Sequence, residues 1–323
     1  RSGVLLNRVA ATFFNLSSAD TNEALDQIRA EVAPMLASHT DQILLNGRLF
    51  ERVRSLYEQR ETLGLNDESL RLVERHYVDF VRAGALLSEA EQQRMQEING
   101  EMAALQTTFT QNVLDGVNAA AIVVDDHDQL AGLPEGQVAA AAAAATSRGL
   151  DGKYVIALLN TSGQPPLSAL ENRSLRERIM RGSLARGSED GEYDNREVIT
   201  RLAELRAERA VMLGYPNHAA YILDEQTAQT VTAVNERLAS LVPAAVANAN
   251  REAVDLQAMA SADVGDVELA AWDWSYYTEK VRAARYDFDA SELRPYFEID
   301  AVIEKGVFYA ATQLYGIIFE ARP

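Results

Sequence analysis

Histidine is the commonest protein ligand for a catalytic zinc ion, and histidines four positions apart lie on one face of a helix. The chain has four histidines, His39, His76, His127 and His218, and none has a second histidine near it. The spacing His-Glu-x-x-His does not occur. We therefore expect no metal site and no catalytic residue among the side chains of this sequence.

Nucleophilic and phosphate-binding motifs are absent as well. Cysteine does not occur, so there is no thiolate nucleophile, no thiolate metal ligand and no disulfide. The patterns Gly-x-Ser-x-Gly, Gly-x-x-x-x-Gly-Lys-Ser/Thr and Gly-x-Gly-x-x-Gly are also missing. Serine-hydrolase, cysteine-protease and common nucleotide-binding chemistry therefore have no support in the sequence.

Two acidic segments could hold a cation. Residues 125–128 read Asp-Asp-His-Asp, and residues 189–194 read Glu-Asp-Gly-Glu-Tyr-Asp. Hard oxygen ligands suit calcium, but the second segment lacks the alternating ligands and the final glutamate of a calcium loop. We prefer the simpler interpretation, in which the first is a solvated acidic turn and the second combines helix capping with solvation.

The aromatic segment 272–277, Trp-Asp-Trp-Ser-Tyr-Tyr, is the strongest candidate for a binding surface. It contains both tryptophans of the chain and is followed by cationic side chains. Aromatic rings beside cations can line a groove that stacks peptide side chains and pairs a carboxylate. From periodicity alone, a helix packed through these rings with a basic outer face is the preferred interpretation. The substrate-channel candidates are Trp272, Trp274, Tyr276, Tyr277, Lys280 and Arg282.

Helices must position these residues, because helical spacing dominates the chain. The clearest helix opens at the capping box Ser88-x-x-Glu91, and its apolar seam predicts lengthwise packing against the preceding antiparallel helices. Asp20 and Glu23 resemble a second capping box. The seam consists of Met95, Ile98, Met102, Leu105, Phe109 and Val113.

Few segments favour strands. Short strands are expected near residues 121–124 and 153–159, and Tyr315–Glu320 resembles the start of another. The fold class is therefore mainly α, an elongated multi-helix bundle. A composition shift near 150–166 suggests two domains, an N-terminal helical bundle at 1–150 and a second helical segment at 151–323.

Composition limits the partners. The net charge of −18 and the pI of about 4.7 disfavour nucleic acid and anionic membrane surfaces. The longest apolar run, the alanine tract 139–145, is too short to span a bilayer, and no signal peptide is recognised. A cytoplasmic location is expected, although a cysteine-free chain is equally compatible with a periplasmic one.

Several separated motifs, in a consistent order, make the chain similar to the thimet-oligopeptidase family of zinc peptidases. Within that family the resemblance is nearest to the peptidyl-dipeptidases. The motifs are Leu-Leu-Asn-Gly-Arg-Leu-Phe at 44–50, Glu-Thr-Leu-Gly-Leu at 61–65, the segment 154–165, the segment 202–219, the aromatic segment continued through 282, Tyr-Asp-Phe-Asp at 286–289, Leu-Arg-Pro-Tyr-Phe at 293–297, Gly-Val-Phe at 306–308 and Leu-Tyr-Gly-Ile-Ile-Phe at 314–319.

The resemblance implies a mostly helical ellipsoid with a deep channel that admits short peptides, and zinc at its floor. It also implies release of dipeptides from a free C-terminus. The family's zinc ligands belong to a region that follows the last matched motif, so none can be assigned to this sequence. We therefore expect a non-catalytic N-terminal portion of the peptidase, inactive alone, that forms one channel wall.

Two further expectations follow from that view. The side facing the zinc-binding half would be exposed and apolar, which predicts self-association. The alternative function is a stand-alone helical binding or scaffold module with no role in peptide hydrolysis, which the caps and apolar seams could support.

Overall fold

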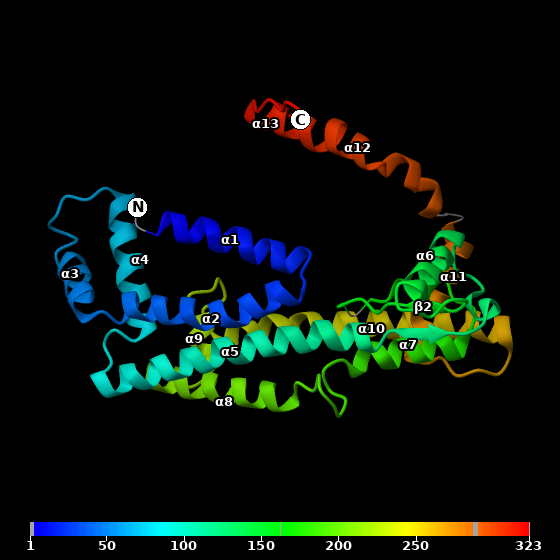
Figure 1. Cartoon of the computed structure of the whole chain (residues 1–323), viewed down its shortest axis with the longest axis horizontal. Coiled ribbons are helices and arrows are strands. Elements are labelled where there is room, and N and C mark those ends of the chain that lie inside the picture. Colours follow the sequence, from blue (N-terminus) through cyan, green and yellow to red (C-terminus); the bar gives the residue numbers. More distant parts are fainter. Residues whose placement is uncertain (1–2, 162, 287–289, 323) are drawn as a thin grey trace. The chain divides into compact units, whose positions relative to one another are not determined.

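The structure is a computed structural model that describes residues 3–161, 163–286 and 290–322. It is mainly helical, as the sequence predicts (Figure 1). The α-helices are α1 Val4–Ala19, α2 Glu23–Leu44, α3 Gly47–Glu58, α4 Asp67–Ala83, α5 Glu89–Ala119, α6 Glu135–Thr146, α7 Arg173–Ala185, α8 Arg196–Met212, α9 His218–Leu223, α10 Val231–Val264, α11 Trp274–Tyr286, α12 Ile299–Ala301 and α13 Tyr309–Tyr315.

Shorter elements connect these helices. One antiparallel sheet occurs within the described residues, and it pairs Ile122 of β1 with Ile156 of β2. Both strands fall where the sequence predicts them. The short elements are β1 Ile122–Val124, β2 Tyr154–Ile156, the 3-10 helices η1 His127–Leu130, η2 Pro165–Ser168, η3 Ala271–Asp273 and η4 Ala290–Phe297, and the π-helix η5 Val302–Phe308.

Contacts among the described residues group the chain into two compact units. Unit 1 comprises residues 1–125, 139–164 and 181–246, and unit 2 comprises 126–138, 165–180 and 247–323. Each unit is described by itself below. The predicted division into 1–150 and 151–323 stays a prediction.

Helix α5 is the central helix of unit 1. Its seam residues Ile98 and Met102 pack on Leu202 and Leu205 of α8, and Ile98 and Leu205 are completely buried. Arg94 pairs with Glu208 and Arg201 with Glu101, which fixes α5 and α8 as antiparallel. The expected neighbour α2 lies along α5, but α8 comes much later in the chain, and local periodicity could not identify it.

The start of α5 agrees with the sequence. Ser88 and Glu91 form the predicted capping box, in which each side chain accepts a hydrogen bond from the other residue's backbone N–H. The box expected at Asp20 and Glu23 is wrong. Helix α2 begins at Glu23 and is capped by Asn22, whose side chain accepts from the Leu25 N–H at 3.1 Å.

The expected strand at Tyr315–Glu320 is also wrong. Helix α13 includes Tyr315, and residues 316–322 are neither helix nor strand. A strand needs a hydrogen-bonding neighbour, and no described segment pairs with this one. Residues 287–289 of the motif at 286–289 lie outside the described residues.

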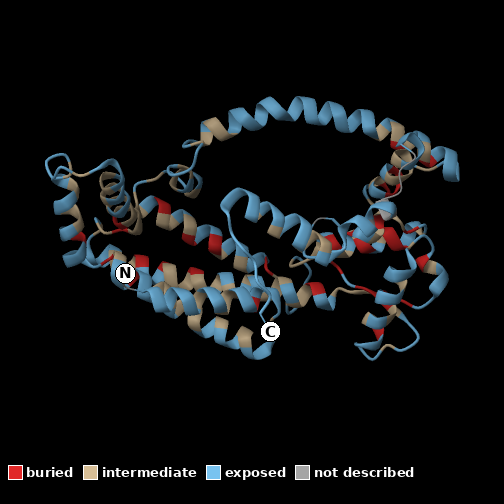
Figure 2. Cartoon of the chain, turned by 90° about the horizontal axis from the view of Figure 1, so that it is seen from above, coloured by how far each residue is buried: buried red, intermediate tan, exposed pale blue. Residues whose placement is uncertain are grey.

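Exposure varies sharply along the helices. Residues 235–252 of α10 are all exposed, and they form the long pale-blue helix in Figure 2. None of the described helices is long and apolar enough to cross a bilayer.

Candidate functional site

The predicted aromatic segment is part of the core of unit 2. It spans η3 and the start of α11, where Tyr276 and Tyr277 are only 8% and 3% exposed. Both rings pack on Leu256 and Ala260 of α10, and Trp274 packs against the same cluster. The helical spacing of the aromatic residues therefore serves the packing of α11 on α10.

A buried ion-pair network lies beneath these rings. Asp273, 1% exposed, accepts hydrogen bonds from Arg173 (Nη2–Oδ2, 2.7 Å) and Arg176 (Nη2–Oδ1, 2.8 Å). Burial alone raises the pKa of Asp273, but the bonds from both arginines outweigh it and leave that pKa below its ordinary value. Asp273 is therefore a buried carboxylate that stays ionised.

Arg176 links this network to the backbone and to the aromatic cluster. Its Nη1 donates to the carbonyl oxygens of Leu170 and Glu171, at 2.7 and 3.0 Å. Its guanidinium lies 4.1 Å from the centre of the Tyr276 ring, close enough for a cation–π interaction. The network thus ties α7 to α11 within unit 2.

The two predicted cations lie nearer the surface. Lys280 donates to Asp263 at 2.7 Å, and its ammonium is 4.8 Å from the centre of the Tyr276 ring. Arg282 pairs with Glu279 one helical turn earlier. The structure thus brings the predicted residues into one unit, with the two tyrosines as core. Their role in a substrate channel stays a prediction.

Sequence reasoning missed Asp273, Arg173 and Arg176 as a cluster. A carboxylate between two tryptophans was the available signal, because a charge inside an aromatic run needs a buried partner. The spacing of the two arginines, three apart on α7, puts both on one helical face. Nothing in the sequence identifies which arginines meet the aspartate.

The acidic segments carry no metal centre within the described ranges, where no three histidine or carboxylate side chains cluster as ligands. Asp125 pairs with Lys153 at 2.7 Å, and Asp126 accepts from the backbone N–H of Asp128. In the second segment, Asp190 and Asp194 both pair with Arg196. These contacts agree with the preferred interpretation of turns and salt bridges.

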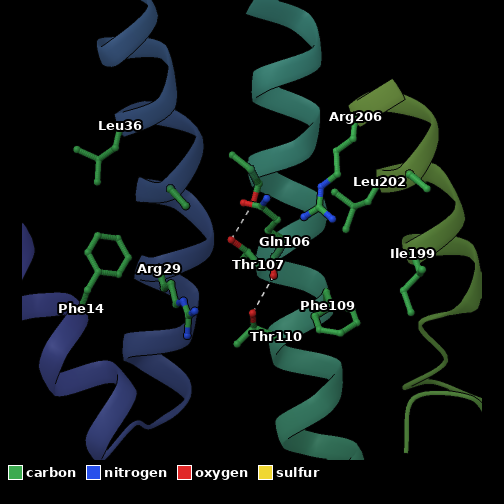
Figure 3. Close-up of a pocket in the computed structure, with 13 residues that line it drawn as sticks. Phe14, Arg29, Leu36, Gln106, Thr107, Phe109, Thr110, Ile199, Leu202 and Arg206 are labelled. Atoms are coloured by element: carbon green, nitrogen blue, oxygen red, sulfur yellow. Dashed lines mark hydrogen bonds between the residues drawn. The ribbon is translucent and has the colours of Figure 1, made fainter. Parts of the chain in front are cut away.

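Unit 1 contains a cavity of about 760 Å³ beside α5 (Figure 3). Aromatic and aliphatic side chains from four helices line most of it. Figure 3 shows Arg29 on α2 and Arg206 on α8 extending toward α5 from opposite sides. The lining side chains are Phe14, Arg29, Ala33, Leu36, Ala103, Gln106, Thr107, Phe109, Thr110, Ile199, Leu202, Ala203 and Arg206.

A second cavity, about 510 Å³, adjoins the first along α5 and shares Ala103, Gln106 and Arg206 with it. Burial raises the pKa of Asp41 in its wall, against the opposing effects of a hydrogen bond from Asn99 and the charge of Arg209. Burial lowers the pKa of His218, and the charges of Arg209 and Arg206 lower it further. The wall around Arg206 is therefore electropositive.

Comparison with known proteins gives a consistent family. The profile of "Peptidase family M3" matches residues 167–323. Over 322 residues the chain is 40% identical to the dipeptidyl carboxypeptidase of Escherichia coli and 38% identical to that of Salmonella typhimurium, covering 100% of this chain in each case. It is 30% identical to oligopeptidase A of Escherichia coli, over 98% of this chain.

The alignments cover 47% of each of these three relatives, so the chain spans about half their length. The identity extends along essentially the entire chain, including unit 1, which lies mostly outside the family profile. The chain is a homologue of the bacterial dipeptidyl carboxypeptidases and belongs to peptidase family M3.

Proposed function

We propose that this chain is the non-catalytic N-terminal portion of a zinc peptidase that releases C-terminal dipeptides from oligopeptides. The carrying observation is the 40% identity to a dipeptidyl carboxypeptidase along the whole chain. In this proposal the chain forms one wall of the channel that receives short peptides.

Zinc chemistry is the family's catalytic device. The residues here do not fit a zinc ion, because the sequence lacks His-Glu-x-x-His and the described residues contain no cluster of three histidine or acidic ligands. The proposal therefore assigns zinc binding and water activation to the part of the relatives that this chain does not cover.

The contribution of unit 2 to the wall is structural at its base and chemical at its surface. The buried pair of Arg176 and Asp273 joins α7 to α11, which holds the aromatic segment in a fixed position. Trp272 and Lys280 are half-buried and sit above this base. They are the side chains of the predicted set that we propose contact peptide.

Hydrolysis assays on the chain and on the complete gene product test the proposed function. The chain with added zinc should not cleave a tripeptide that has a blocked amino end and a free carboxyl end. A gene product whose sequence continues into an in-frame His-Glu-x-x-His should release a dipeptide from it, and a chelator should abolish that release. Chelator-sensitive cleavage by the 323-residue chain alone would contradict the proposal.

A stand-alone helical binding or scaffold module is the second candidate. The observation that favours it is that each unit has a buried cluster of its own, built from residues of this chain. A stop codon directly after Pro323 would support the module, whereas an in-frame zinc motif downstream would support the peptidase.

A further inference from the structure

The two arginines of the larger cavity in unit 1 have no partner among the described residues. Neither Arg29 nor Arg206 makes a hydrogen bond, an ion pair or a cation–π contact there. Both are half-buried. The chain has 48 acidic side chains against 30 basic ones, so carboxylates are not scarce.

Neighbouring arginines on the same side of unit 1 are paired. Arg94 of α5 contacts Glu208 of α8 at 2.6 Å, and Arg201 of α8 contacts Glu101 of α5 at 2.6 Å. Arg206 lies on α8 between the two α8 residues of these pairs and Arg209, yet it extends into the cavity instead. A half-buried guanidinium left without an anion is costly, so this wall is suited to receive one.

The remainder of the cavity is suited to apolar groups. Phe14, Phe109 and Leu36 line it together with Ile199 and Leu202. The hydroxyl groups of Thr107 and Thr110 donate to the carbonyl oxygens of Ala103 and Gln106 on their own helix, so they add little polarity. A volume of about 760 Å³ lies in the usual range for small-molecule sites.

We propose that this cavity binds a carboxylate attached to an apolar group, as at the C-terminus of a short peptide that ends in an aromatic or aliphatic residue. Arg29 and Arg206 hold the carboxylate, and the aromatic and aliphatic wall receives the side chain. A strongly hydrated dianion such as phosphate fits less well, because most of the wall is apolar. The peptide form of the ligand rests on the proposed function, whereas the shared chemistry does not.

Calorimetric titration of the 323-residue chain, without metal, tests this site. The probes are N-acetyl-Leu-Phe with a free carboxylate, the same peptide as its C-terminal amide, and decanoate. The free acid should bind at least ten-fold more tightly than the amide, because only the acid can accept charged hydrogen bonds from both guanidinium groups. Equal affinity for acid and amide would overturn the proposal without any variant.

Decanoate separates the two sources of the ligand. Tighter binding of the peptide acid assigns the site to peptide C-termini, and tighter binding of decanoate assigns it to free fatty acids. Either result supports recognition of an apolar carboxylate. Binding of neither contradicts it, and leaves the hydrolysis test of the proposed function unaffected.

Variants locate the site. Arg29→Gln and Arg206→Gln should each weaken binding of the acid at least ten-fold, and Arg206→Lys should weaken it less because the charge remains without the bidentate fork. Arg52→Gln is the matched control, since Arg52 is exposed on α3 and has no partner among the described residues. Circular dichroism verifies folding of each variant. Equal losses in the control and in the cavity variants would overturn the assignment.

Discussion

At the scale of single residues, unit 2 depends on opposite charges removed from water. Asp273 and Arg176 are both almost completely buried, and they contact each other at 2.8 Å. Desolvating two charges is expensive, so such a pair adds little net stability compared with apolar residues of the same size. Removing one partner is different, because the other is left as an uncompensated buried charge.

Replacement of Asp273 by asparagine should therefore lower the free energy of unfolding by about 3–5 kcal/mol at neutral pH. Urea unfolding followed by tryptophan fluorescence measures the change, because Trp272 and Trp274 flank Asp273. Asp128→Asn is the control, since the Asp128 side chain is 94% exposed, and it should change stability little.

The pH dependence of stability follows from the lowered pKa of Asp273. The ionised carboxylate stabilises the fold fully above its unfolded pKa of about 3.9, and this contribution is lost as the pH falls through the lower folded pKa. The gap in stability between the parent chain and Asp273→Asn should therefore be constant near neutral pH and shrink below about pH 4. A gap that grows on acidification would contradict the assignment.

At the scale of elements, α5 organises unit 1 because two of its faces are used. One face packs apolar side chains against α8, and Leu205 of α8 is completely buried there. Asn99 of α5 donates to Asp41 of α2 at 2.9 Å, which links α5 to its other neighbour. The cavity that we propose as a binding site is framed by these same helices, so their packing sets its shape.

Replacement of Leu205 by alanine should lower the free energy of unfolding by about 2–5 kcal/mol, since it removes a buried side chain and leaves a void. Denaturant unfolding followed by far-ultraviolet circular dichroism measures this. Leu184→Ala makes the same chemical change at a position that is 72% exposed, and it should cost much less. Similar losses at both positions would mean that the α5–α8 seam is not a stabilising interface.

At the scale of the whole molecule, the chain exposes many large apolar side chains. Those of the C-terminal part of unit 2 include Tyr296, Phe297, Leu314, Tyr315 and Ile318, each between 68% and 80% exposed. Exposed apolar surface of this kind favours association. The self-association expected from the sequence stays a prediction, and this segment is where we expect it.

Sedimentation at increasing protein concentration tests this expectation. The parent chain should form dimers or larger species, and the triple variant Tyr296→Ser, Leu314→Ser, Ile318→Ser should shift toward the monomer. A second triple variant on α10, Leu238→Ser, Val242→Ser, Val246→Ser, compares another exposed apolar surface. A larger shift in the α10 variant would locate the contact there, and a monomeric parent chain would contradict self-association.

The sequence by itself determined the helical class, the capping box at Ser88, the two short strands and the family resemblance. These are local or ordered signals: hydrophobic period, capping chemistry, β-branched runs and motifs in series. It also determined that no zinc-binding motif is present, because that motif is defined by spacing along one helix. It failed at Asp20 and at Tyr315–Glu320, where a neighbouring cap or the lack of a pairing strand decided the outcome.

Only the tertiary structure decided which residues meet across long separations in the sequence. Asp273 lies 97 positions from Arg176, and α8 reaches α5 with Arg201 and Glu101 100 positions apart. Helical periodicity states which face of a helix is apolar, but not which other helix covers it. The same reason explains Arg29 and Arg206: that two arginines lack partners can be recognised only after every other side chain has been placed.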